Sequence, residues 1–98
     1  MEELDAYHKK FKKILDEMLA ISQKKQHDYR GAATTNQYGM KMRFADIWRK
    51  FARLEAMMWY DTVPKTDEKL KETLIDLANY CIIATIMVDD AKKDDIGV

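Results

Sequence analysis

LIDLANYCIIATIMV, at residues 74–88, decides the fold of this chain because it forms a helix that is apolar on nearly every side. A helix of that kind is normally buried by neighbours on several faces. Glu72, Asp76 and Asn79 nevertheless share one face of it, and Tyr80 follows them. Burying such groups without partners costs about 1–3 kcal/mol each. The sequence therefore predicts that a basic side chain, a metal ion or a polar ligand satisfies them.

The composition indicates one globular, helical domain over residues 1–98. It is 47% hydrophobic and 35% charged, with only three glycines and one proline, and this shortage of helix breakers favours helices. The formal net charge is zero. A neutral chain is not one that coats nucleic acid, so we expect no duplex nucleic acid as a partner.

The neutral total hides an uneven distribution of charge. Residues 27–60 carry six basic and three acidic side chains, whereas residues 61–98 carry five and nine. The basic middle segment is where contacts to a phosphate or another anion are expected. The alternative is that the two segments pair with each other in the fold.

The single cysteine, Cys81, excludes an intramolecular disulfide and a zinc site built from cysteines. We expect it to be a small buried residue at a helix contact. The chain opens on an acidic, polar segment rather than a signal peptide. Residues 74–88 are too few to span a bilayer and include Asp76. These features predict a cytoplasmic protein without a membrane partner.

The spacing of apolar residues predicts an all-α fold with three main helices, at about residues 3–26, 40–60 and 66–90. Apolar residues recur at steps of three and four along the first two, which is typical of amphipathic helices. Thr66 is a good N-cap for the third helix. The charged tail at residues 89–98 is expected to fray.

The third helix has two apolar stripes, more than two partner helices in so short a chain can cover. The uncovered surface predicts a homo-oligomer that completes the fold, with the third helix or the edge at Trp48 and Trp59 as the interface. One stripe consists of Leu70, Leu74, Leu77, Cys81, Ala84 and Val88, and the other of Ile75, Ile82 and Ile86.

The connection at residues 27–39 is long, since bundle helices are usually joined by about two to eight residues. Its aromatic, charged and small polar residues are typical of a ligand-binding loop. We expect Asp28, Tyr29 and Arg30 to close over a ligand.

Arg49 and Arg53 lie four residues apart and project from one side of the second helix. Two arginines so placed can clamp a phosphate or a carboxylate through bidentate hydrogen bonds, with Lys50 as a helper. The alternative is that they pair with nearby carboxylates of the chain.

The polar edge of the third helix has two possible uses. As ligand-binding residues, Asp76, Asn79 and Tyr80 would contact base or ribose edges or orient the arginines. As metal ligands, Glu55, Glu72 and Asp76 would hold Mg²⁺, which prefers carboxylate oxygens. The second helix offers no further carboxylate beside Glu55, so this metal set is incomplete.

Three short motifs follow one another along the chain: KQHDY at 25–29, DIWRKFARLE at 46–55 and ETLIDLANY at 72–80. In this order they resemble the phage-borne nucleotide modification associated domain family, over roughly residues 10–90. The resemblance implies an all-α fold and a nucleotide-like ligand. It also implies a distant similarity to MazG-type nucleoside triphosphate pyrophosphatases, which bind Mg²⁺ through Glu-x-x-Glu and Glu-x-x-Asp. The first two helices have no Glu-x-x-Glu, and Glu72 to Asp76 is one residue too long for Glu-x-x-Asp.

The residues and the resemblance together predict that the chain binds a nucleotide-type phosphate ligand without a cofactor. If the gene is viral, the chain would be an anti-defence sponge for a nucleotide signal in the host cytoplasm. One alternative is a Mg²⁺-dependent nucleoside triphosphate pyrophosphohydrolase, and another is a non-catalytic helical interaction module. The expected ligand-binding residues are Asp28, Tyr29, Arg30, Arg49, Lys50, Arg53, Asp76, Asn79 and Tyr80.

Overall fold

The fold is all-α, as predicted. A computed structural model describes residues 2–25 and 39–96, which form helices and turns without a strand. The elements are α1 (Glu2–Lys24), α3 (Met40–Leu54), the π-helical turn η1 (Glu55–Trp59) and α4 (Asp67–Ile96).

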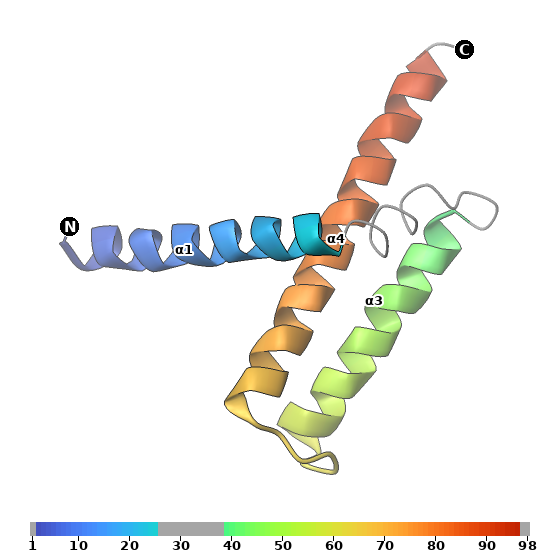
Figure 1. Cartoon of the computed structure of the whole chain (residues 1–98). Coiled ribbons are helices and arrows are strands. Elements are labelled where there is room, and N and C mark those ends of the chain that lie inside the picture. The colour runs from blue at the N-terminus through green and yellow to red at the C-terminus, as the bar shows by residue number, and fades with distance from the viewer. Residues whose placement is uncertain (1, 26–38, 97–98) are drawn as a thin grey trace.

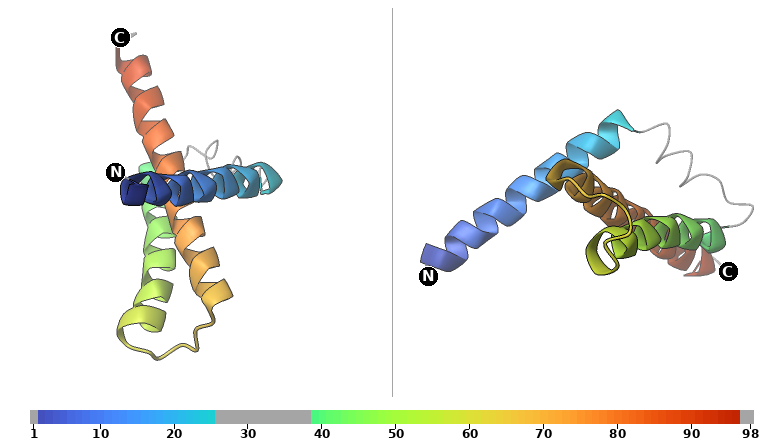
Figure 2. Two further views of the ribbon diagram at one scale, coloured as in Figure 1. Left: turned by 90° about the vertical axis from the view of Figure 1, so that its left-hand side faces the viewer. Right: turned by 90° about the horizontal axis from the view of Figure 1, so that it is seen from below.

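The centre of the fold is an antiparallel hairpin of α3–η1 and α4, which lie side by side (Figures 1 and 2). α1 crosses α4, and its N-terminal half projects away from the hairpin (Figures 1 and 2). The C-terminal half of α4 likewise extends past the start of α3 (Figure 1). Much of two helices is therefore left without a neighbour.

The hairpin turn is shaped by local backbone hydrogen bonds. In η1 the Tyr60 amide donates to the Glu55 carbonyl at 3.0 Å, a wide turn often found at helix C-termini. Asp61 follows with φ 53°, the left-handed conformation that commonly ends a helix. Thr66 then caps α4, because its Oγ1 accepts a hydrogen bond from the Lys69 amide at 3.2 Å. The predicted N-cap is confirmed.

α1 is held against α4 by three polar contacts at its C-terminal end. Asn79 Nδ2 donates to the Met18 carbonyl at 3.4 Å, and Lys71 Nζ lies 2.9 Å from Glu17 Oε2. The Lys71 ammonium lowers the pKa of the Glu17 carboxyl. Lys25, just beyond α1, makes the third contact by pairing with Asp76.

The core is small and nearly half polar. The buried hydrophobic side chains are Met18, Leu54, Met57, Ile75 and Ile83, and Met57 is completely buried. The buried polar side chains are Arg43, Thr73, Asp76 and Asn79. Several side chains that can form hydrogen bonds or ion pairs are therefore buried where the helices meet.

The helix limits differ from the predicted ones in three ways. α1 ends at Lys24, two residues early, and the second helix widens into η1 over its last five residues. α4 continues to Ile96, so the expected fraying from residue 89 is wrong: no glycine or proline interrupts the helix before Gly97. Residues 27–38 of the predicted loop lie outside the described residues.

The prediction that Cys81 is buried is also wrong, since its side chain is exposed. It lies on the face of α4 that carries Leu74 and Val88, both of which are exposed as well. The described helices therefore leave this face of α4 uncovered. None of the described helices is long and apolar enough to cross a membrane.

Candidate functional site

Polar side chains of α3 and α4 meet along the inside of the hairpin. On α3 they recur at steps of three and four, which puts them on one helix face. We call this set the polar seam: Arg43, Asp46, Lys50 and Arg53 of α3, with Lys69, Thr73, Asp76 and Tyr80 of α4.

Asp76 is the central group of the polar seam. It is only 6% exposed. Lys50 Nζ lies 3.1 Å from its Oδ2, and Lys25 Nζ lies 3.3 Å from its Oδ1. Basic side chains are therefore what satisfies this carboxylate, and one of the pairs joins the middle of the chain to its acidic C-terminal part. Removing either partner of such a buried pair leaves the other charge uncompensated.

Glu72, Asp76 and Asn79, which share one face of α4, have different surroundings. Asp76 is ion-paired, and Asn79 is buried and bonded to the backbone of α1. Glu72 is exposed and forms no ion pair within 4 Å in the described part of the chain. Asn79 thus serves to position α1.

A small polar hollow opens between α3 and α4 at the hairpin-turn side of Asp76. Its volume is about 150 Å³. Of its three basic residues, Lys50 is paired with Asp76, whereas neither Arg53 nor Lys69 has a carboxylate within 4 Å among the residues described. The hollow therefore presents two cations without an ion pair, from two different helices, beside the carboxylate of Glu72. It is lined by Lys50, Arg53, Lys69, Glu72, Thr73 and Asp76.

Arg43 and Arg49 share one carboxylate at the other end of the polar seam. Arg43 Nη2 lies 3.3 Å from Asp46 Oδ2, and Arg49 Nη2 lies 3.1 Å from Asp46 Oδ1. Arg43 is only 2% exposed, yet its Nε and Nη1 have no hydrogen-bond partner among residues 2–25 and 39–96. A buried donor without an acceptor costs about 1–3 kcal/mol. Arg43 is thus a position where an added acceptor would be bound strongly.

Tyr80 lies beside these charges on α4. Burial raises the pKa of its hydroxyl group, and the Asp46 carboxylate raises it further. Both effects disfavour the tyrosinate, because it would be poorly solvated and close to another negative charge. Tyr80 is accordingly a neutral hydroxyl over the physiological pH range.

This gives a prediction for alkaline titration. The pKa of Tyr80 in the folded chain lies above its unfolded value near 10, so folding stability is complete below about pH 10 and falls as the pH rises toward the folded pKa. Ultraviolet titration of tyrosinate should show one late-titrating group that Tyr80→Phe removes. Tyr80→Phe should also make chemical unfolding less sensitive to pH between 10 and 11. A Tyr60→Phe control, at an exposed residue, should leave the late step in place; loss of that step in the control would contradict the assignment.

The structure brings together only part of the predicted ligand-binding set. Lys50, Arg53 and Asp76 line the polar hollow, but Arg49 is exposed, binds Asp46 and does not line it. Arg53 therefore shares the hollow with Lys50 and Lys69 and not with Arg49, while the phosphate clamp of Arg49 with Arg53 stays a prediction. Asp28, Tyr29 and Arg30 lie outside the described residues.

The predicted metal ligands are divided between two places. Glu72 and Asp76 line the polar hollow, whereas Glu55 lines an apolar groove formed by α3, η1 and α4. Within residues 2–25 and 39–96, no three His, Cys, Asp or Glu side chains converge in a way that would hold a metal ion.

Four residues of the polar seam were not among the ligand-binding residues expected from the sequence: Arg43, Asp46, Lys69 and Thr73. Lys69 and Thr73 precede Asp76 at helical spacing, and Arg43 precedes Asp46 and Lys50 in the same way. That periodicity was a usable signal. The pairing of α3 with α4 was also needed, because it alone puts Lys69 opposite Arg53.

The fold and the hollow define a small all-α protein with a cationic site between two antiparallel helices. Residues 25–88 match nucleotide modification associated domain 1. Because this match covers well over half of the chain, the protein belongs to that family, and its role is related to nucleotides. Searches among curated proteins and among solved structures each gave no match.

Proposed function

We propose that the chain binds a nucleotide through a phosphate group seated in the polar hollow. The observation that carries this proposal is that Arg53 and Lys69 line the hollow from two helices without a neutralising carboxylate within 4 Å in the described regions. A guanidinium group offers a planar fork of donors to phosphate, and an ammonium group adds a point charge. Membership in a nucleotide-related family supports the class of ligand.

The size of the hollow limits what it holds. Its volume of about 150 Å³ is below the roughly 300–1,000 Å³ of pockets that enclose a whole small molecule. The hollow therefore suits a phosphate group, with the base and ribose outside it. Asp28, Tyr29 and Arg30, which we expected to close over a ligand, lie outside the described residues.

Binding without turnover is the version of this function that we favour. The hollow contains two carboxylates, and one of them, Asp76, is already paired with two lysines. A protein that binds stoichiometrically needs no metal and no nucleophile. In a viral setting, such a chain would act as a sponge that sequesters a nucleotide signal in the host cytoplasm.

The second function is a Mg²⁺-dependent nucleoside triphosphate pyrophosphohydrolase, favoured by the presence of Glu72 and Asp76 in the same hollow as Arg53. Their oxygen ligands suit Mg²⁺. Bound Mg²⁺ would polarise the phosphate, and Arg53 and Lys69 would neutralise charge on the leaving group. Glu55 would need to reach this site from the apolar groove on the other side of α3.

Native mass spectrometry of the protein as purified from cells tests the proposal directly. We expect the released small molecule to have the mass of a nucleotide, or the empty protein to bind added nucleoside triphosphate without consuming it. Release of pyrophosphate or monophosphate upon adding Mg²⁺ would favour the enzyme instead. An empty protein that binds none of a panel of nucleotides would overturn the proposal and leave the interaction module.

A further inference from the structure

Two large apolar surfaces have no partner among the residues that the structure describes. The first, which we call the apolar arm, is the stripe on α1 that projects beyond α4 (Figure 1). Its side chains are between 37% and 58% exposed, although they would form a continuous hydrophobic strip on the helix. The apolar arm consists of Leu4, Tyr7, Phe11, Ile14 and Leu15.

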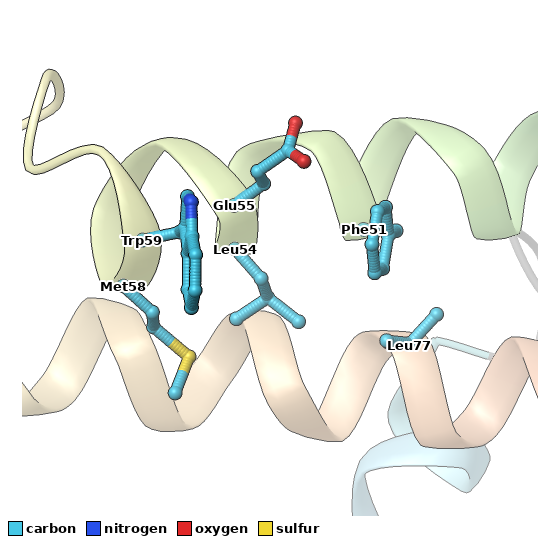
Figure 3. Close-up of a pocket in the computed structure, with 6 residues that line it drawn as sticks. All are labelled: Phe51, Leu54, Glu55, Met58, Trp59 and Leu77. Atoms are coloured by element: carbon cyan, nitrogen blue, oxygen red, sulfur yellow. The ribbon is translucent and has the colours of Figure 1, made fainter.

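The second surface, the apolar groove, lies between η1, the end of α3 and α4. Its volume is about 430 Å³. Figure 3 shows Trp59, Met58 and Phe51 standing along its length, and Trp59 is 78% exposed. The full lining is Phe51, Leu54, Glu55, Met58, Trp59 and Leu77.

The apolar arm does not reach the apolar groove of its own chain. α1 is fixed to the opposite side of α4 through Asn79 and Lys71. In Figure 3 the pale blue helix lies behind α4, whereas the lining side chains stand in front of it. Within the described residues, neither surface covers the other, so each can meet a second molecule.

The accessible surface of the chain is large for a protein of its mass. Its accessible surface is 8053 Å², whereas a folded monomer of 11.6 kDa exposes about 5,800 Å². The radius of gyration is 16.0 Å, against about 12.6 Å for a compact chain of this length. The chain is therefore more open than a compact monomer, as expected of a protomer that buries roughly 1,000–2,500 Å² in an obligate homodimer.

We propose that the occupant is a second copy of this chain, in a two-fold dimer where each apolar arm lies in the apolar groove of the other copy. Charge supports this pairing. Glu55 is the only charged residue that lines the groove, and Lys10 flanks the apolar arm. Neither has an ion pair within its own chain in the part that the structure describes. The dimer is independent of the proposed nucleotide binding, because the polar hollow lies on other residues.

The test is the molar mass of the protein in solution by sedimentation equilibrium, for the wild type and two variants. We expect a wild-type dimer, and monomers for Phe11→Glu and for Trp59→Glu. Both residues are exposed in the single chain, so helicity by circular dichroism should be retained. Ala20→Glu adds the same charge to the opposite, exposed face of α1 and should stay dimeric. A monomeric wild type, or a monomeric Ala20→Glu control, would overturn the proposal.

Mixing the two variants distinguishes the arm-in-groove arrangement from other dimers. In a mixture, the intact groove of the Phe11→Glu chain can take the intact arm of the Trp59→Glu chain, which restores one of the two contacts. We expect native mass spectrometry to detect this heterodimer at concentrations where each variant alone is monomeric. If arm packed against arm and groove against groove instead, every contact in the mixed dimer would include one substituted surface. A mixture that remains monomeric would therefore contradict the arm-in-groove arrangement. Nucleotide binding by the monomeric variants is a separate readout, so the two proposals can fail independently.

Discussion

Arg53→Ala combined with Lys69→Ala is expected to weaken the binding of inorganic pyrophosphate or a nucleoside triphosphate by about a hundredfold or more. A hydrogen bond to a charged group contributes about 1.5–3 kcal/mol, and each 1.4 kcal/mol is about tenfold in affinity. The two side chains line one hollow from two helices without a competing carboxylate within 4 Å in the described regions. Isothermal titration calorimetry measures the change directly.

A matched control separates a specific site from general attraction. Lys41→Ala with Arg49→Ala removes the same charge from α3, at two exposed residues that do not line the hollow. We expect this control to change affinity by a few-fold at most, and less at higher ionic strength, where exposed charges are screened. Equal losses in the two double variants would show that the phosphate is attracted by the basic surface in general.

Met57→Ala is expected to lower the free energy of unfolding by about 2–5 kcal/mol, the usual cost of deleting a fully buried large side chain. Met57 is 0% exposed, and the buried hydrophobic core contains few other residues. The loss is large beside the roughly 5–15 kcal/mol by which whole domains are stable. Urea denaturation followed by circular dichroism gives the value.

The control for this substitution is Met40→Ala, because Met40 is 47% exposed at the start of α3. It should change the unfolding free energy by no more than about 0.5 kcal/mol, as is usual at the surface. A similar small change for Met57→Ala would mean that the packing of the buried η1 side chain contributes little to the stability of the fold.

The fold was largely predictable because its signals are local. Steps of three and four between apolar residues predicted three helices, and the hydroxyl of Thr66 predicted where α4 begins. The widening into η1 was not predictable in this way, since nothing in its sequence departs from an α-helical pattern. The exposure of Cys81 was missed because α4 has two apolar stripes, and the sequence alone does not determine which of them packs against α3.

The site residues were predictable only where their spacing along a single helix brings them together. The spacing along α3 pointed to Arg49 and Arg53, with Lys50 as a helper. Burial of Asp76 called for a basic partner, which Lys50 and Lys25 supply. Whether Arg49 or Lys69 accompanies Arg53 depends on how α3 and α4 face each other. That arrangement is set by packing between distant residues, so the sequence alone favoured Arg49 while the structure places Lys69 at the hollow.

Whether a phosphate group binds at Arg53 and Lys69 in the polar hollow is best tested by side-chain NMR of the protein titrated with a nucleoside triphosphate. This measurement locates the phosphate. We expect the arginine Nε–H signal of Arg53 and the Nζ signal of Lys69 to shift together in one saturable step, while Arg49 changes little. Saturable shifts centred on Arg49, or on residues of the apolar groove, with Arg53 and Lys69 unchanged would contradict binding in the polar hollow.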